Sequence, residues 1–414
     1  MANLVPALRG LTLLVLLANA AGLLTPVVDA GDSVTYAALA QHMAVTGDWV
    51  NLMLDGQDWL DKPHFPFWLT ALSFRLFGVS AFSYNLPGFL FHLLAAACTY
   101  GLARRWHGRQ TAWLAVLVFV SAFQVMLTSS AVRAEAYLTG SITAACLAWL
   151  RYHDRPALAP LLLGAFFSAT ALMTKGVFTL ITITSGLLAL WIWQRRWDRL
   201  WSLQWWAALA LTLLFTLPEM VALYLQFDAQ PDKQVFGRTG VSGIGFFWWD
   251  SQFGRFFNTG PIRNADGSPF FFLHVFLWAF LPWVPVFFAA LGGGPRRPAP
   301  RDPGPREARV FLWASFGVTF ALFSLTRFQL DYYTVILFPF AAILCAPVLA
   351  DALERAAASR RLAWAQAAMG CLGALLALGM AAWVGQPALP ALLGGLVAVA
   401  GVAAVVRWRG PVPG

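Results

Sequence analysis

The chain has 414 residues, of which 59% are hydrophobic and only 11% are charged, and its mean hydropathy is +0.65. Soluble domains typically carry about 25% charged residues, so this composition excludes an ordinary soluble protein and predicts an all-α protein that crosses a membrane several times. The net charge of +9 does not require nucleic acid as a partner, because membrane proteins concentrate Arg and Lys in their cytoplasmic loops.

Twelve apolar segments are candidate membrane spans, since a helix needs about 20 apolar residues to cross the bilayer. They cover residues 8–28, 82–103, 111–130, 132–150, 157–174, 176–194, 204–226, 270–292, 309–326, 332–350, 362–384 and 387–406. The first lacks the small-residue cleavage site of a signal peptide, so we expect it to remain as the first helix. The cysteines Cys98, Cys146, Cys345 and Cys371 lie inside apolar segments and are interpreted as packing residues.

The basic residues separate cleanly when these segments alternate across the membrane. One side receives most of the 28, namely Arg9, Arg151, Arg155, Arg407, Arg409 and the clusters at 104–109, 195–199, 296–309 and 355–361. This sorting predicts that both termini are cytoplasmic and that the polar loops 29–81 and 227–269 face outward. An N-terminal membrane module would span 1–291 and a plainer C-terminal module 309–414, joined by the cytoplasmic Pro/Arg-rich linker 292–308.

The first polar loop, from Asp29 to Trp68, concentrates acidic residues. It contains Asp29, Asp32, Asp48, Asp55, Asp58 and Asp61, but a single base, Lys62. A solvated external loop and a hydrated site at the membrane face both explain such a composition. The site is favoured by the sequence Asp61-Lys62-Pro63 and by Tyr36, which follows Asp32 by one helical turn and is placed to orient it. Short helices are expected at 33–45 and, at the membrane interface, at 65–77.

Lysine is rare in this chain, and its positions are informative. Three of the 28 basic residues are lysines, Lys62, Lys175 and Lys233, and all three fall on the outward side. A lysine supplies the compact point charge that suits a phosphate group. The alternative is that these side chains extend from the membrane interface towards water, which is the interpretation we favour for Lys233.

Other charged residues lie at the outer ends of predicted spans. Arg133 and Glu135 open the segment 132–150; an acid at this position favours function, although interfacial anchoring is the alternative. Arg255 lies in the loop 227–269, which either covers a site or only connects two spans. Arg327 and Tyr333 flank the start of segment 332–350, where an aromatic belt explains tyrosines equally well.

Carboxylates and bases from separate segments thus gather at the outward face. This combination suits an anionic substrate carried on a lipid. The bases would neutralise a departing phosphate, and a carboxylate would accept the proton of the attacking nucleophile.

These motifs resemble those of bacterial GT-C glycosyltransferases, the relatives of the lipid A aminoarabinose transferase and of the protein O-mannosyltransferases. The likeness extends from the first predicted span to the tenth and lies in Asp32 to Tyr36, Gly47 to Val50, Asp61-Lys62-Pro63, Phe67-Trp68-Leu69, Leu76-Phe77-Gly78, Glu135, Lys175-Gly176, Arg255-Phe256, Pro282-Trp283, and Tyr333 before Pro339. The resemblance implies a GT-C-like membrane fold. It also implies that a sugar is transferred from a polyprenyl-phosphate donor to a lipid, glycan or protein acceptor, at the periplasmic face of a bacterial inner membrane.

The resemblance further implies roles for individual residues. Asp32 matches the first-loop carboxylate proposed as the base, and Glu135 matches a second acid near the acceptor, where relatives mostly have Asp. Lys62 matches the lysine that holds the donor phosphate, with Arg255 and Tyr333 as further phosphate partners. The remaining expected substrate-binding residues are Tyr36, Asp61, Arg133, Lys175 and Arg327.

Several positions depart from the family pattern. The usual Lys-Pro-Pro is Lys62-Pro63-His64 here, and the lysine expected shortly before Tyr333 is Gln329, with Arg327 as a nearby substitute. A histidine that some relatives carry after Arg255 is not evident, so the sequence does not support a bound divalent metal or any other cofactor. We expect this chain to lack the C-terminal soluble domain of the aminoarabinose enzyme, which weakens the assignment of that particular sugar.

A transporter or flippase for polyprenyl-linked sugars or lipids is the alternative function. Such a protein should carry inverted repeats, broken helices at mid-membrane and charges deep in the bilayer, and the sequence indicates none of these. A scaffold without catalytic activity would not need acids and bases at the outer face.

Overall fold

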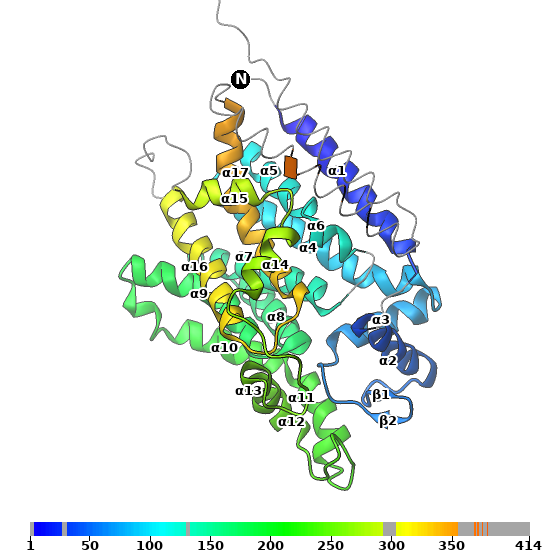
Figure 1. Ribbon diagram of the computed structural model, residues 1–414. Helices are drawn as coiled ribbons and strands as arrows, with labels where there is room; N and C mark the ends of the chain where they lie inside the picture. Colours follow the sequence, from blue (N-terminus) through cyan, green and yellow to red (C-terminus); the bar gives the residue numbers. More distant parts are fainter. Residues whose placement is uncertain are drawn as a thin grey trace, which may run out of the picture.

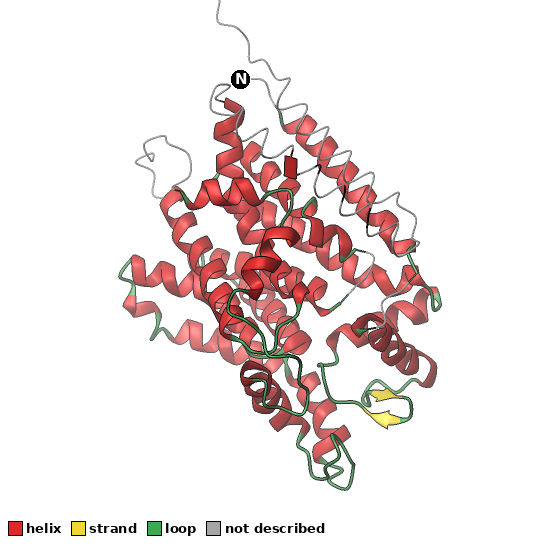
Figure 2. Cartoon of the chain, in the orientation of Figure 1, coloured by secondary structure: helices red, strands yellow, loops and turns green. Residues whose placement is uncertain are grey.

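The computed structural model describes residues 4–26, 31–129, 133–292 and 304–354, together with Ala368, Met369, Cys371, Leu375 and Gly379. Helices make up most of this part of the chain, and its one sheet is a two-stranded hairpin (Figure 2). The predicted all-α membrane architecture is therefore confirmed. The predicted spans 362–384 and 387–406, most of the linker 292–308 and Asp29 lie outside the described ranges.

Five stretches of the described chain are long and apolar enough to cross a membrane. They are α1 (Val5–Ala21) with the turn η1 (Gly22–Leu24), α4 (Ala81–Trp106), α8 (Leu158–Lys175), α16 (Gly304–Leu325), and the 3₁₀ helix η5 (Asp331–Leu337) with α17 (Phe338–Glu354). Shorter apolar helices are α3 (Phe65–Phe77), α5 (Arg109–Val120) and α9 (Phe178–Trp193). The total of twelve spans stays a prediction.

Several predicted spans are broken helices, so the expectation that the sequence contains none is wrong. Segment 204–226 forms α10 (Leu203–Phe215), α11 (Leu217–Leu223) and the π-helical turn η3 (Tyr224–Asp228), with a bend of 41° after Phe215. Pro218 explains this bend, because its ring crowds the preceding turn and it lacks an N–H group. The run 270–292 divides into α14 (Phe271–Ala279) and α15 (Val284–Leu291) around Pro282, and 111–130 divides into α5 and α6 (Phe123–Leu127).

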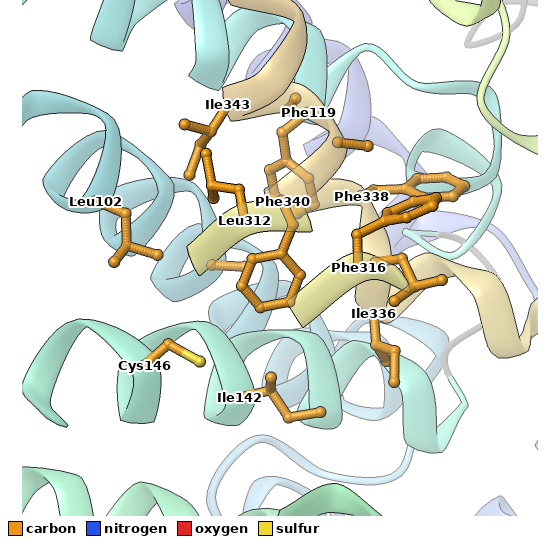
Figure 3. Close-up of a cluster of buried hydrophobic side chains, with 14 of the residues drawn as sticks. Leu102, Phe119, Ile142, Cys146, Leu312, Phe316, Ile336, Phe338, Phe340 and Ile343 are labelled. Carbon is orange, nitrogen blue, oxygen red and sulfur yellow. The ribbon is translucent and has the colours of Figure 1, made fainter. Parts of the chain in front are cut away.

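Helix α7 (Ala134–Asp154) lies inside the bundle. It packs against α4, α8, α9 and η5, and every residue from Ala134 to Leu150 is buried. Figure 3 shows Ile142 of this helix in the same buried cluster as Phe119 of α5, Phe316 of α16 and Phe340 of α17. Lipid is as apolar as these side chains, so close packing rather than exclusion from water holds them together.

Helices on both sides of the linker 292–308 share this core. Helix α16 packs on α9, and α17 packs on α5 and α4. The division of the chain into two membrane modules therefore stays a prediction, and the helices themselves form one continuous packed cluster.

The two loops that were predicted to face outward lie at one end of the bundle, opposite the beginning of α1 (Figure 1). The first loop contains α2 (Asp32–Thr46), the strands β1 (Met53–Leu54) and β2 (Gln57–Asp58), and α3; both expected short helices are thus confirmed. The second loop contains α12 (Gly243–Gly245), the π-helical turn η4 (Phe246–Asp250) and α13 (Ser251–Phe257). A turn η2 (Trp197–Arg199) joins α9 to α10.

Candidate active site

A first ionic cluster joins the two outer loops. Nζ of Lys62 lies 2.9 Å from Oδ2 of Asp61. The guanidinium of Arg255, on α13, donates to Oδ1 of the same carboxylate and, at 2.9 Å, to the Asp61 carbonyl oxygen. Arg255 also donates to the hydroxyl of Ser251 at 2.8 Å, one helical turn earlier. Two loops far apart in sequence therefore bring two cations to one carboxylate.

The surrounding cations keep Asp61 ionised. Burial raises the pKa of Asp61, but the charges of Lys62 and Arg255 outweigh burial, and the net pKa lies below the ordinary value. Lys62 itself is only 7% exposed, so its charge is little screened by water. The donors of this cluster are already aligned for an anionic ligand.

A second ionic pair lies where α7 begins and α8 ends. Glu135 occupies the first turn of α7 and Lys175 is the last residue of α8, so each charge is favoured by the partial charge of its own helix terminus. Nζ of Lys175 donates to Oε1 of Glu135, and both residues are buried. Within the described residues, the second carboxylate oxygen of Glu135 is buried and has no hydrogen-bond partner.

Two tyrosines of η5 connect this pair to Asp32. Nζ of Lys175 lies 3.6 Å from the ring centroid of Tyr333, a close cation–π contact. The hydroxyl of Tyr332 donates to Oδ2 of Asp32 at 2.7 Å. The guanidinium carbon of Arg133 lies 4.3 Å from the ring centroid of Tyr332. The tyrosines that an aromatic belt would explain therefore contact charged groups instead.

Tyr36 lies within reach of the charges of both clusters. Burial, followed by the charges of Asp32, Asp61 and Glu135, raises the pKa of Tyr36 well above its ordinary value. Its ring packs edge-on against Phe67, with 5.0 Å between the ring centroids. We predicted that Tyr36 orients Asp32, but the hydroxyl bound to Asp32 belongs to Tyr332.

The site carries a positive formal balance. Its carboxylates are those of Asp32, Asp61 and Glu135, and its bases are Lys62, Arg133, Lys175 and Arg255. Among the described residues, four bases against three acids leave one positive charge, which favours an anion such as a phosphate group.

For Arg327, a predicted site residue, the described part of the chain gives no side-chain hydrogen bond, ion pair or ring contact. Arg327 is exposed, and its backbone N–H donates to the carbonyl of Phe256 at 2.9 Å, which ties this segment to the end of α13. Gln329 is buried and donates to the carbonyls of Ser268 and Thr326. The proposed replacement of the family lysine by Arg327 therefore has no contact to support it.

Among the described residues, three other acids of the first loop have structural roles. Asp48 accepts hydrogen bonds from the backbone of Val50 and Asn51. Asp55 lies in the turn between β1 and β2, where it and Gly56 have φ values of 51° and 75°, as a two-residue hairpin turn of type I′ requires. Asp58 pairs with Lys233 at 2.8 Å, so Lys233 is a loop-to-loop contact and not only an interfacial base. Asp32 and Asp61 are the loop acids within the site.

Sequence analysis missed a third buried ion pair, between His64 and Glu219. His64 was noted only as a departure from the Lys-Pro-Pro pattern. Glu219 was overlooked, although an acid inside an apolar segment is a recognised sign of a specific role. Across the described ranges, no three His, Cys, Asp or Glu side chains are grouped as a metal site would require.

Comparison with known families gives a match over more than half of the chain. Residues 7–229 match the family model described as dolichyl-phosphate-mannose-protein mannosyltransferase. An undecaprenyl phosphate-alpha-4-amino-4-deoxy-L-arabinose arabinosyl transferase of Shewanella sediminis is 27% identical over 333 residues, which cover 79% of this chain and 56% of the relative. The transferase of the same description from Edwardsiella ictaluri is 29% identical over 322 residues, covering 76% and 54%. The chain thus spans about half the length of the curated relatives that it matches.

Solved structures share the fold. ArnT from Cupriavidus metallidurans bound to undecaprenyl phosphate matches with a TM-score of 0.72 and 19% identity, covering 98% of this chain and 77% of that one. The oligosaccharyltransferase AglB from Archaeoglobus fulgidus matches with a TM-score of 0.55 and 12% identity, covering 95% and 56%. The architecture is therefore that of the polytopic GT-C membrane proteins, as the first-loop motifs implied. The chain belongs to the dolichyl-phosphate-mannose-protein mannosyltransferase family.

Proposed function

We propose that this protein transfers a sugar from a polyprenyl-phosphate-linked donor to a lipid, glycan or protein acceptor. The observation that carries the proposal is the convergence of Lys62 and Arg255 on Asp61 from two different loops. One cation is enough to neutralise a buried carboxylate. Two aligned cations, in a site whose net charge is positive, suit the binding of a phosphate group. The descriptions of the relatives, which name undecaprenyl phosphate and dolichyl phosphate, support the same ligand class.

In this proposal, Lys62 and Arg255 bind the phosphate of the donor. The phosphate remains on the polyprenyl chain and is the leaving group when the sugar is transferred. Its developing negative charge is stabilised by cations that are already in place, which is the usual source of the largest catalytic contribution. Lys175, which lies against the ring of Tyr333, supplies a further cation.

Asp32 is the base in this mechanism. It is half-buried, and Tyr332 donates to its Oδ2 oxygen. We assign Oδ1 as the oxygen that accepts a proton from a hydroxyl nucleophile. Glu135 is fully buried and bound to Lys175, a position that suits alignment of the acceptor rather than proton transfer. No metal ion is required by this assignment of roles.

An assay of the purified, reconstituted protein tests the proposal. Polyprenyl-phosphate-linked sugars are supplied, and the release of free polyprenyl phosphate is measured. We expect Lys62→Ala to lower turnover by about 10- to 100-fold, since a hydrogen bond to a charged group typically contributes about 1.5–3 kcal/mol. Lys62→Arg should not fully restore turnover, because a planar guanidinium is not a point charge.

Lys233→Ala is the matched control. Lys233 is also a lysine of an outer loop held by an aspartate, Asp58, but it lies outside the site. Its removal should leave turnover near the wild-type rate. Full activity of Lys62→Ala protein, or an equal loss in both variants, would contradict the assignment of Lys62.

We also propose that the site faces the periplasm and that the protein resides in a bacterial inner membrane. The charge sorting places the loops 29–81 and 227–269 outside, and both lie at one end of the bundle (Figure 1). Single cysteines introduced at Gln57 and Arg301 test this orientation in intact cells. A membrane-impermeant thiol reagent should modify the first and not the second; the reverse pattern would overturn the orientation.

A further inference from the structure

The His64–Glu219 pair joins the first outer loop to the bent span α10–α11. The backbone N–H of His64 donates to Oε2 of Glu219, and its Nδ1 lies 3.0 Å from Oε1. The other ring nitrogen, Nε2, lies 2.9 Å from the carbonyl oxygen of Val50. Both side chains are completely shielded from solvent, with 0% exposure.

The surroundings of the ring determine its charge. A carboxylate and a carbonyl oxygen accept hydrogen bonds but cannot donate them, and they face the two ring nitrogens of His64. An imidazole donates from both nitrogens only when it is protonated. This geometry favours a buried imidazolium paired with a buried carboxylate. Such a pair is costly to bury, and breaking it leaves an uncompensated charge.

The pair lies immediately beside the proposed phosphate-binding residue. His64 precedes the first residue of α3, and only Pro63 separates it from Lys62. Proline fixes its own φ angle and restricts the residue before it. A displacement of His64 is therefore transmitted to Lys62 with little backbone freedom to absorb it.

We infer that the His64–Glu219 pair positions Lys62 for donor binding, an inference that rests on the proposed transfer from a polyprenyl-phosphate donor. Glu219 holds both the backbone and the ring of His64, so it fixes the position and the rotation of the segment that carries Lys62. Glu219 acts through other residues and is a positioning residue.

A second link between the same two parts of the chain offers a matched control. Gln226, on η3 just after α11, accepts a hydrogen bond from the N–H of Leu52 and donates to its carbonyl, both at 3.0 Å. It also donates to Asp58 at 3.0 Å. Gln226 is buried like Glu219. Its contact with Leu52 lies ten residues before Lys62, and its contact with Asp58 lies in the hairpin, away from the phosphate-binding residues. Loss of this link loosens the loop without directly releasing Lys62.

The experiment compares donor binding and turnover in the full-length wild-type protein and in the variants Glu219→Gln, Glu219→Ala and Gln226→Ala. The probe for binding is a short-chain polyprenyl phosphate, measured by native mass spectrometry in detergent. We expect Glu219→Ala to weaken probe binding and to raise the donor KM by about 10-fold or more, the low end of what a hydrogen bond to a charged group contributes. It should also lower kcat, by no more than Lys62→Ala does, because Lys62 stabilises the departing phosphate as well as binding it. Glu219→Gln, which keeps the side-chain volume and one acceptor oxygen, should give a smaller shift in the same direction.

The control variant distinguishes a specific effect on donor binding from a general loss of stability. Gln226→Ala should lower the unfolding temperature while leaving the donor KM within about 2-fold. Equal KM shifts in the Glu219 and Gln226 variants, or unchanged probe binding in Glu219→Gln, overturn the positioning role. If Glu219→Ala does not fold, Glu219→Gln decides. Wild-type protein that neither binds the probe nor transfers sugar would instead refute the proposed function itself.

Discussion

The hydroxyl group of Tyr332 donates a hydrogen bond of 2.7 Å to Oδ2 of Asp32, across 300 positions of sequence. This contact ties the beginning of the first outer loop to the 3₁₀ helix η5. The ring of the same tyrosine also lies beneath the guanidinium of Arg133, 4.3 Å from the ring centroid. Tyr332 thereby fixes the carboxylate that we assign as the base.

Removing this hydroxyl should therefore slow the reaction without abolishing binding. We expect Tyr332→Phe to lower turnover by about 10- to 100-fold, because a hydrogen bond to a charged group contributes about 1.5–3 kcal/mol, while the aromatic ring and its contact with Arg133 remain. Single-turnover kinetics and donor binding are the measurements. Tyr224→Phe, at an exposed tyrosine of η3, is the control, and indistinguishable rates for the two variants would show that the Tyr332 hydroxyl has no role in catalysis.

Asp32 should contribute more to turnover than the acids of the same loop that lie outside the site. General-base catalysis typically contributes about 10²–10⁴-fold, so Asp32→Asn should lower single-turnover rates by at least about 10²-fold with donor binding largely kept. Asp55→Asn is the matched control, since Asn tolerates the positive φ of this turn. If Asp32 and Asp55 were interchangeable surface acids, both variants would show the same small effect.

Contacts of the site can be predicted from the sequence when the two contacting residues are close together along the chain. Lys62 and Asp61 are adjacent in a recognisable motif, and the match to Arg255 was carried by family resemblance. The partner of Asp32 was expected one helical turn away, at Tyr36, because local spacing is what a sequence displays. The actual partner, Tyr332, reaches Asp32 through packing that brings η5 against α7, and no local pattern encodes that approach.

Some features of the fold could likewise be predicted from the sequence, and others could not. Hydropathy located the long apolar helices of the bundle, because an apolar run is needed wherever a helix meets lipid or the core, but it did not locate α12 and α13 in the second outer loop. It did not locate the breaks at Pro218 and Pro282, since the residues on both sides of each break are equally apolar. Glu219 was hidden for the same reason, as a single acid inside the run 204–226. Its partner, His64, lies 155 positions away.

The buried pair Glu135–Lys175 should behave as a unit in stability measurements. Removing one partner of a buried ion pair costs about 3–5 kcal/mol, so Lys175→Met should clearly lower the unfolding temperature in detergent. The double variant Glu135→Gln/Lys175→Met should recover much of this loss, because no charge is left uncompensated, but it should not recover turnover. Arg105→Ala breaks a partly exposed ion pair with Asp154 and should cost about 1 kcal/mol or less. Strictly additive losses at Glu135 and Lys175 would contradict a coupled pair.

The His64–Glu219 pair should give the protein a pH-dependent stability. Burial lowers the pKa of His64, but the charge and hydrogen bond of Glu219 outweigh burial, and the net pKa lies above the ordinary value of 6.5. The folded state therefore binds this proton more tightly than the unfolded state. The resulting stabilisation is complete below pH 6.5 and is lost as the pH rises through the folded-state pKa.

The difference in unfolding temperature between wild-type protein and Glu219→Gln isolates this contribution, because other titrating groups cancel. Without the carboxylate, the pKa of His64 is no longer raised, so the variant should lack the pH-dependent part of the stabilisation. We expect the difference to be largest near pH 6 and to shrink as the pH rises above 6.5. His42→Gln, at a half-buried histidine of α2 outside this pair, should retain the wild-type pH profile. A wild-type advantage that stays constant from pH 6 to pH 9 would mean that Glu219 does not hold the proton on His64.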